Sequence, residues 1–180
     1  MFKKMNFITS KSLQVLYFLA SNPLNQFHER EVVRQTGVSV GAVNKILRDF
    51  YEHDLLEKEK RGRMHLYRIN IKNPVVRQFK VLFNVLSLNE LIRDIRGLCK
   101  KIILFGSCSE GADVKESDVD IFILTSDSAD VRKKINDYER QFDKKISPII
   151  VNSNEFVRMK QEDKPLYERI SRGIVLWEQE

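Results

Sequence analysis

The chain has 180 residues, of which 42% are apolar and 31% charged, a composition typical of a globular protein with one ordinary domain or two small ones. Seven Gly and four Pro exclude a collagen-like or low-complexity chain, and no apolar run approaches the roughly 18 residues that span a bilayer, so we expect no membrane partner. The two cysteines, Cys99 and Cys108, fit neither a disulfide framework nor a zinc site, and we therefore expect a cytoplasmic location.

Charge is spread unevenly along the chain. Residues 1–86 hold 15 Lys and Arg against 7 Asp and Glu, a net charge of +8, whereas residues 87–180 hold 16 against 18, a net charge of −2. A basic unit beside an acidic one is the pattern expected when the first meets a polyanion and the second holds cations or has an unrelated role. A chance skew of a solvated surface is the alternative.

Three short helical patterns open the chain. Apolar residues recur at three- and four-residue spacing over residues 13–20 and predict the first helix. A second helix is predicted from Glu29 to Gln35, and it ends at Gly37, where a left-handed residue permits a tight turn. The third helix begins at Ser39. Its buried stripe is expected to contain Val43, Ile46, Leu47 and Phe50.

After the third helix the apolar period changes from 3.6 to 2. This change predicts two strands, residues 55–60 and 64–70, joined by Arg61-Gly62-Arg63 as a hairpin with a basic tip. The string REVVRQTGVSVGAVNKILRDFYEHDLLEKEKRGRMHLYRIN, with the first helix, resembles the winged helix-turn-helix domain of transcriptional regulators over about residues 5–72. The resemblance implies that the third helix enters the major groove of duplex DNA.

The residues expected to face DNA are Ser39, Gly41, Asn44, Lys45, Arg48, Arg61 and Arg63. Small residues at the front of the third helix let the backbone approach closely, and Asn44 has the donor and acceptor pair that suits an adenine edge. The cationic side chains neutralise phosphates without reading sequence. The alternative is that this domain packs on protein and that these residues are solvated charges.

Residues 73–87 are predicted to form a helical connector between a first domain, 1–72, and a second, 88–180. Asn73-Pro74 begins an amphipathic helix, and Ser87 with Glu90 has the spacing of a capping box that would begin the next helix. We favour packing of these apolar stripes within the chain. Pairing of two chains in a homodimer is the close alternative, because a helix-turn-helix protein usually reads two half-sites.

The most informative stretch reads LFGSCSEGADVKESDVDIFIL, in which an apolar strand ends in Gly106-Ser107 and Asp118 and Asp120 lead into a second strand. A Gly-Ser turn before a short helix exposes backbone N–H groups that favour the negative charge of a triphosphate. Asp118 and Asp120 are two residues apart, so their carboxylates point to one face and can share hard divalent cations as metal ligands and catalytic groups. The residues predicted to bind nucleotide are Gly106, Ser107, Gly111 and Ser117, of which Ser117 is expected to orient the strand.

This stretch matches the G-S-x(3)-G-x(5)-S-D-x-D pattern of the nucleotidyltransferases that resemble DNA polymerase β, with the spacing kept throughout. It is most similar to the minimal nucleotidyltransferase domains and to kanamycin nucleotidyltransferase. The resemblance covers about residues 88–180 and implies an α/β domain with a small mixed sheet. It also implies Mg²⁺ (or Mn²⁺) and an NTP as cofactors, with attack of a hydroxyl on the α-phosphorus and release of pyrophosphate. The expected fold class is therefore α+β, with a winged helix-turn-helix followed by this nucleotidyltransferase-type domain.

The chain departs from the family pattern on its third strand, where active members commonly carry another carboxylate. Residues 145–151 read KISPIIV, and Ser147 stands at the expected position. No Asp or Glu lies between Asp143 and Glu155. A hydroxyl is a weak substitute for a charged ligand or a proton acceptor, so we expect binding of Mg-NTP with catalysis in doubt.

The favoured hypothesis is a DNA-binding transcriptional regulator whose second domain binds Mg-NTP. The alternative is an active nucleotidyltransferase that transfers NMP to a protein, RNA or small-molecule hydroxyl, with the winged helix as a targeting module. The resemblance to minimal family members implies one version of it, an antitoxin that transfers AMP to a partner protein. An adaptor in which both domains bind protein is less favoured, and resemblance of fold alone does not decide among these functions.

Overall fold

The structure, a computed structural model, describes residues 8–179. Backbone packing divides the chain into two compact units that meet between Lys80 and Val81, inside a helix. This division falls within the connector predicted for residues 73–87, and the domain boundaries at residues 72 and 88 stay predictions. None of the helices in the described residues is long and apolar enough to cross a bilayer.

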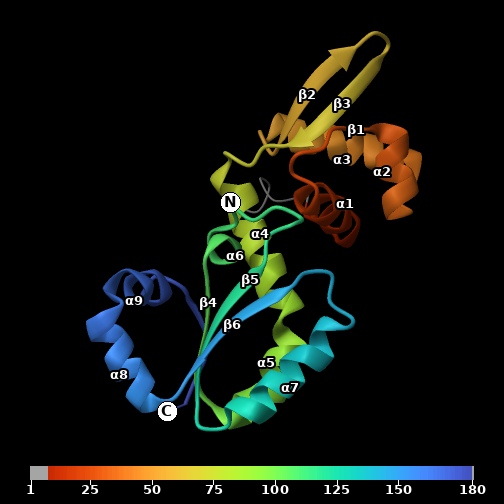
Figure 1. The fold of residues 1–180 in the computed structure, drawn as a ribbon. Coiled ribbons are helices and arrows are strands. Elements are labelled where there is room, and N and C mark those ends of the chain that lie inside the picture. Colours follow the sequence, from red (N-terminus) through yellow and green to blue (C-terminus); the bar gives the residue numbers. More distant parts are fainter. Residues whose placement is uncertain (1–7, 180) are drawn as a thin grey trace. The chain divides into compact units, whose positions relative to one another are not determined.

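The first unit combines helices with a small antiparallel sheet (Figure 1). Its helices are α1 (Ser10–Ser21), α2 (Glu29–Thr36), α3 (Val40–Glu52) and the first half of α4 (Pro74–Ser87). The strands, in their order across the sheet, are β1 (Phe27–His28), β3 (Met64–Ile69) and β2 (Leu56–Arg61). The two-residue strand β1 was not expected from the sequence.

A glycine closes the turn between α2 and α3. Gly37 has a φ of 67° and ends α2 in the left-handed conformation, as the sequence predicts, and α3 begins three residues later after Ser39. The stripe predicted for α3 is buried against the rest of the unit. With β2 and β3 as the hairpin that follows α3, this is the winged helix-turn-helix arrangement.

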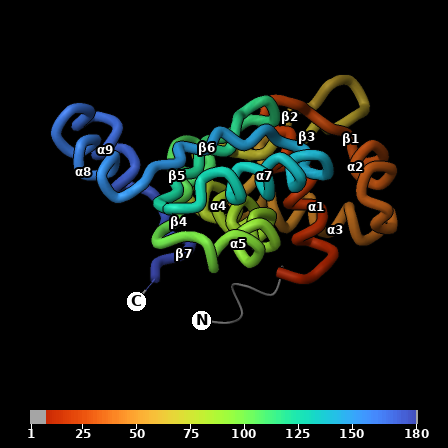
Figure 2. The backbone as a smooth tube through the Cα atoms, turned by 60° about the horizontal axis from the view of Figure 1, so that its bottom comes forward, coloured from red at the N-terminus to blue at the C-terminus, as the bar shows by residue number. Residues whose placement is uncertain are grey.

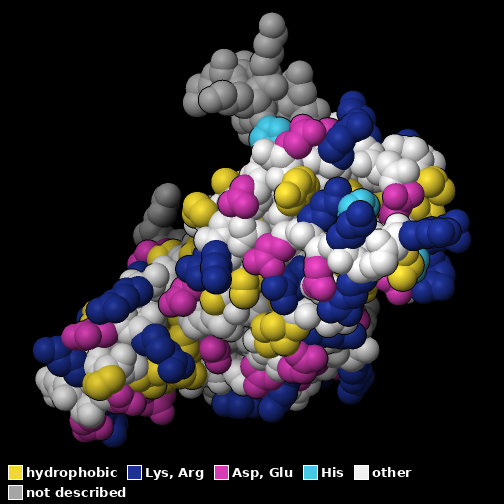
Figure 3. All heavy atoms as spheres, turned by 90° about the horizontal axis from the view of Figure 1, so that it is seen from above, with side chains coloured by type: hydrophobic (Ala, Val, Ile, Leu, Met, Phe, Trp, Pro, Cys, Tyr) yellow, Lys and Arg dark blue, Asp and Glu magenta, His cyan; other side chains and the backbone are white. Residues whose placement is uncertain are grey.

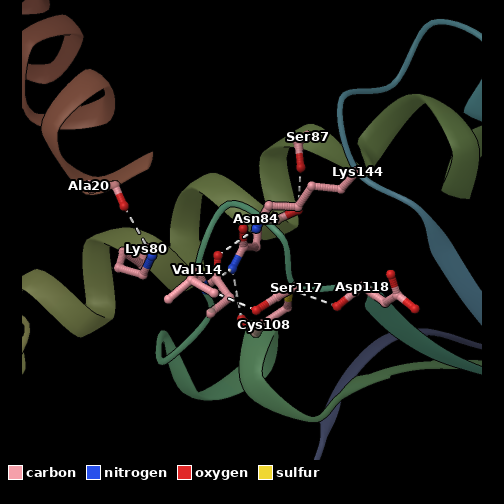
Figure 4. A network of polar contacts seen from close by, with 10 residues as sticks. Ala20, Lys80, Asn84, Ser87, Cys108, Val114, Ser117, Asp118 and Lys144 are labelled. Atoms are coloured by element: carbon pink, nitrogen blue, oxygen red, sulfur yellow. Dashed lines mark hydrogen bonds and ion pairs between the residues drawn. The ribbon is translucent and has the colours of Figure 1, made fainter. Parts of the chain in front are cut away.

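Lys80 of α4 is buried in the first unit, with 4% of its surface exposed. Its Nζ donates a hydrogen bond to the carbonyl of Ala20 at 3.0 Å, near the C-terminus of α1 (Figure 4). The C-terminal end of a helix carries partial negative charge, which offsets part of the cost of burying an ammonium group.

The second unit is built on a four-stranded mixed sheet in the order β6-β5-β4-β7. Its strands are β4 (Cys99–Phe105), β5 (Val119–Thr125), β6 (Ile146–Val151) and β7 (Ile174–Glu178). Its helices are α5 (Asn89–Ile95), the 3-10 turn η2 (Arg96–Leu98), α6 (Ser107–Glu110), α7 (Ser128–Glu139), α8 (Ser153–Glu162) and α9 (Lys164–Ser171). Strands β5 and β6 are parallel and joined through α7, while β4 pairs antiparallel with β5 and β7, so the predicted mixed sheet is confirmed.

Helices cover both faces of this sheet (Figures 1 and 2). Val119, Ile121 and Ile123 of β5 belong to the core formed with α5 and α7. Phe122 of β5 and Phe105 of β4 belong to the core formed with α8 and α9. Successive residues of a strand point to opposite faces, so the even-numbered residues of β5 face α8 and α9.

The start of α5 differs from the predicted capping box. Ser87 is the last residue of α4, and its Oγ donates to the carbonyl of Asn84 at 2.8 Å. The residue before α5 is Leu88, which is fully buried and offers no side-chain cap. Burial of Leu88 and Leu91 outweighs the ~1 kcal/mol that a polar cap contributes, and this sets where the helix begins.

Candidate functional site

A glycine turn joins β4 to α6 and lies against a carboxylate. Gly106 has φ 69° and ψ −158°, a conformation that side chains rarely adopt, and Gly111 ends α6 in the left-handed conformation with φ 66°. A Cβ placed on Gly106 would lie 2.2 Å from Oδ2 of Asp120. The predicted phosphate turn and the predicted metal ligand are therefore in direct contact, and only glycine permits this approach.

The two carboxylates and Ser147 come together on one face of the sheet. Asp120 pairs across β4 with Phe105 and across β6 with Ser147. Asp118 comes just before β5, and its Oδ2 accepts a hydrogen bond from Oγ of Ser147 at 3.2 Å. Asp118 is exposed and Asp120 half-buried, on the face covered by α8 and α9. The hydroxyl thus stands beside both acids, where the family pattern predicts a third carboxylate.

The electrostatics of this face favour a bound cation. Partial burial raises the pKa of Asp120 above its usual value, the nearby guanidinium of Arg169 lowers it, and the neighbouring charge of Asp118 raises it. The net result is a raised pKa of Asp120, so this carboxylate holds its negative charge at a cost. A divalent cation bound between the two carboxylates would remove that cost.

These residues fit a hard divalent ion. Asp118 and Asp120 offer carboxylate oxygens on one face, which is the donor set that Mg²⁺ accepts together with water and phosphate oxygens. In the described part of the chain, no three residues of His, Cys, Asp or Glu are grouped as a metal site. An ion bound here would depend on the two carboxylates and on the phosphate oxygens of a bound nucleotide. Bound Mg²⁺ would neutralise phosphate charge and polarise an acceptor hydroxyl.

Polar contacts hold the loop between Gly106 and the carboxylates (Figure 4). Oγ of Ser117 accepts a hydrogen bond from the N–H of Val114 at 2.9 Å. Nδ2 of Asn84 donates to the carbonyl of Cys108 and to Oδ1 of Asp113, both at 3.0 Å. Asp113 is buried, and its Oδ2 also pairs with Nζ of Lys144 at 2.5 Å. The contact of Ser117 with Val114 supports the loop, and a role of Ser117 in orienting the carboxylate strand stays a prediction.

Cys108 is packed inside this loop. The side chain is fully buried, and its Sγ lies 3.6 Å from the carbonyl of Asp118. Burial of this kind suits a small filler between the turn and the carboxylates. The other cysteine, Cys99, is also buried, and burial raises the pKa of its thiol to about 11, so it stays protonated at neutral pH.

The residues predicted to face DNA on α3 are exposed. The apolar stripe of the helix faces inward, which leaves the opposite side of α3 to solvent. The exposed set on this side is Ser39, Gly41, Asn44, Lys45 and Arg48. The structure brings these residues together at the beginning and along one side of one helix, as reading of a groove requires.

The wing is less uniformly basic than its tip sequence implies. Nε of Arg61 donates to Oε1 of Glu59 at 2.8 Å, and Gln26 donates to the other oxygen of Glu59. Arg63 is exposed and makes no ion pair within residues 8–179. Figure 3 shows Lys and Arg side chains interspersed with Asp and Glu on the face that it presents. Arg63 is therefore the freer of the two predicted phosphate contacts at the tip.

Two residues outside the predicted site lie at its edge, Asn84, which sequence reasoning missed, and Arg169, for which the sequence favours a solvated helix face over contact with a nucleotide. Asn84 reaches the loop from α4, and Arg169 of α9 holds its guanidinium carbon 5.3 Å from the centroid of the Phe105 ring. The sequence around Arg169 gives only an amphipathic pattern, in which a solvated cation is the ordinary expectation. Its place beside Asp120 depends on how α9 packs on β4, which no local signal reveals.

Comparison with known proteins gives one family match. Residues 88–180, more than half of the chain, match the family model described as "Polymerase beta, Nucleotidyltransferase". This range contains the glycine turn, both carboxylates and Ser147. No curated protein is significantly similar to the chain in sequence.

Several solved structures are similar to about half of the chain. AF1382 from Archaeoglobus fulgidus is 21% identical, with 44% of this chain and 90% of that chain covered and a TM-score of 0.39. A predicted DNA-binding transcriptional regulator from E. coli is 27% identical over 47% and 83%, with a TM-score of 0.39. The homodimeric winged helix-turn-helix domain of Mb0332 from Mycobacterium bovis is 21% identical over 52% and 74%, with a TM-score of 0.34. The winged-helix assignment of this chain rests on its own element order.

Proposed function

The chain belongs to the polymerase β nucleotidyltransferase family, and we propose that it is a DNA-binding transcriptional regulator whose C-terminal domain binds a nucleoside triphosphate with Mg²⁺ or Mn²⁺. The winged helix-turn-helix domain supports the first half of the proposal, through the exposed side of α3 and the basic wing. A homodimer on DNA would read two half-sites. The glycine turn and the carboxylate pair support the second half.

One observation favours nucleotide binding over transfer of NMP. The partner of Asp120 on β6 is Ser147, whose Oγ donates to Asp118. A hydroxyl in this place supplies no negative charge to a cation and accepts no proton from an attacking hydroxyl at neutral pH. Asp118 and Asp120 still provide oxygens for a metal bound to a triphosphate, so the site retains binding and lacks a base.

The second candidate is an active nucleotidyltransferase that transfers NMP to a protein, RNA or small molecule. The direct approach of Gly106 to Asp120 favours it, because the turn and the metal ligands keep their mutual contact. The winged helix would then position the enzyme on its target. Both candidates use the same residues and differ only in whether a carboxylate at position 147 is needed for transfer.

Release of pyrophosphate by the full chain with Mg²⁺ and mixed NTPs tests the two candidates. We expect negligible turnover by the wild type and a measurable rate for Ser147→Asp, since a positioned base contributes about 10²- to 10⁴-fold. The matched control is Ser147→Asn, which has nearly the same shape without the charge. Robust wild-type turnover that disappears in Asp118→Asn would establish the enzyme and reject the binding-only proposal.

A second experiment tests the DNA half separately. Binding of the full chain to genomic DNA fragments is measured across a series of salt concentrations. We expect affinity to fall steeply with salt, because counterions are released when Lys and Arg neutralise phosphates. Asn44→Ala is expected to change sequence preference more than the salt response. Absence of binding at low salt on every fragment would contradict the regulator proposal.

A further inference from the structure

The loop that would receive a triphosphate carries little positive charge of its own. Between Gly106 and Ser117 it contains one lysine, Lys115, and three acids, Glu110, Asp113 and Glu116. Asp113 is already paired with Lys144. Backbone N–H groups and one metal site would have to offset the charge of the phosphate chain unless a cation comes from another element.

Arg169 is a cation that the fold brings to this place from α9. The next residue of α9, Ile170, is buried with Phe105 and Phe122 and fixes the helix on the sheet. The guanidinium of Arg169 lies over the ring of Phe105, 5.3 Å from its centroid, and Phe105 directly precedes the glycine turn. Its positive charge also lowers the pKa of Asp120, which places the two groups within electrostatic reach.

The order of the strands shows on which side of the carboxylates Arg169 lies. Ser147 is on β6, Asp120 on β5 and Phe105 on β4, and these strands are neighbours in that order. Arg169 is therefore separated from Ser147 by the carboxylate strand. It lies on the side of Gly106 and Ser107, where a phosphate chain would run, and away from the side where an acceptor would approach the third position.

Arg169 is also available to a ligand. The residue is exposed, and it forms no ion pair with a carboxylate anywhere in the described chain. An aromatic ring beneath a guanidinium holds its plane and leaves its N–H donors at the edge, where they can bind phosphate oxygens in pairs. A cation that lies over an aromatic ring, is exposed and is unpaired by any carboxylate of the described chain differs from the paired arginines of the wing, Arg61 and Arg68.

We propose that Arg169 binds the phosphate chain of the nucleotide on the side of the Gly106-Ser107 turn, and thereby favours nucleoside triphosphates over monophosphates. This role rests on the proposed function, because it requires that the carboxylate face binds Mg-NTP. It adds a specificity determinant from α9, an element outside the sequence motif. Arg169 would contact phosphate oxygens beyond the α-phosphate.

The test is the dissociation constant of the full chain for Mg-NTP, for the matching NMP and for inorganic tripolyphosphate with Mg²⁺. Arg169→Ala is expected to weaken Mg-NTP and tripolyphosphate about 10- to 100-fold, the range of a lost charge-assisted hydrogen bond, and to change NMP affinity by less than about twofold. Arg169→Lys should recover part of the loss, since a lysine keeps the charge without the planar fork.

Arg158→Ala is the matched control. Arg158 is an arginine of α8 that lines a cavity of about 350 Å³ with Ile150 and Val151, at the opposite end of β6 from Ser147. Its removal should leave every dissociation constant and the melting temperature unchanged. Arg169→Ala should stay folded with only a slightly lower melting temperature, because it loses the contact with Phe105. A wild type that binds Mg-NTP and an Arg169→Ala variant that binds it equally would refute the role of Arg169 alone. A wild type that binds neither Mg-NTP nor tripolyphosphate would overturn both the role of Arg169 and the proposed function.

Discussion

Replacement of Gly106 by alanine tests the geometry on which the nucleotide site depends. The backbone of Gly106, with φ 69° and ψ −158°, lies in a region that costs an L-residue about 1–3 kcal/mol. The new Cβ would also lie 2.2 Å from Oδ2 and 3.2 Å from Cγ of Asp120. The carboxylate must rotate away, at about 0.5–1.5 kcal/mol for a side chain forced from its rotamer. The free energy of unfolding should therefore fall by about 2–4 kcal/mol.

This loss is measured by thermal unfolding of the full chain. It corresponds to a drop of about 5–15 °C in the melting temperature for a chain of this size. The control is Gly97→Ala in η2, where an added Cβ meets no atom within 4 Å and the backbone is not left-handed. That change should be neutral or stabilise slightly by removing freedom from the unfolded chain. Equal melting temperatures for the two variants would show that Gly106 does not contact Asp120 as described.

The rise in melting temperature with Mg²⁺ and NTP distinguishes a damaged glycine turn from a general loss of stability. Mg²⁺ with NTP should raise the melting temperature of the wild type and of Gly97→Ala by linkage. Gly106→Ala should lose this increase, because the displaced carboxylate of Asp120 no longer lies beside Asp118. An undiminished shift in Gly106→Ala would reject the assignment of Asp120 as a metal ligand.

Arg63→Ala should reduce the slope of log K, the association constant for DNA, against log salt concentration by about 0.9. Arg61→Ala should reduce the slope less, because Arg61 already pairs with Glu59. Equal slopes for the two variants would contradict this. Asp120→Asn should raise the metal-free melting temperature by about 1–3 °C at pH 7. Burial raises the pKa of Asp120 in the folded state above its ordinary value of 3.8. The gain in melting temperature should therefore be present above the folded-state pKa, where Asp120 is charged, and vanish below pH 3.8, where it is protonated in both states. A series of melting curves at different pH checks this. Asp113→Ala leaves a partly buried ammonium uncompensated and should cost about 1–3 kcal/mol in urea unfolding.

The parts of the site that the sequence predicts are those fixed by short covalent spacing. Gly106 directly follows β4 and Asp120 is the second residue of β5, and the apolar runs of the sequence mark both strands, whereas the antiparallel pairing of Phe105 with Asp120 is a finding of the structure. Ser147 was singled out by the resemblance to the nucleotidyltransferase family, and the structure pairs Ile146 with Val119 and Ser147 with Asp120. The pairing of Asp120 with Ser147 agrees with that alignment.

The parts that the sequence does not reveal depend on tertiary contacts. Strand β1 has two residues, too few for an alternating pattern, and exists because Phe27 pairs with Tyr67 of the wing. Asn84 and Arg169 act on the loop and on the carboxylates from helices whose own patterns indicate only a buried side. Their positions follow from how α4 and α9 pack, which sums many weak interactions and leaves no motif.

Ser147→Asp is a fair test of the proposed lack of a third carboxylate, because it changes a side chain and leaves the backbone of β6 in place. β6 is an edge strand, so the missing N–H of Pro148 need not break the ladder, and the parallel register from Ile146 to Val151 is kept. The backbone therefore already carries position 147 to the side of Asp118, as the hydrogen bond from its hydroxyl shows. A carboxylate there would face the same two acids and would be held only if a cation neutralised all three. Ser147→Asp should accordingly lower the melting temperature without metal and regain it with Mg²⁺, and a fall that Mg²⁺ does not reverse would show that position 147 is not part of a metal site.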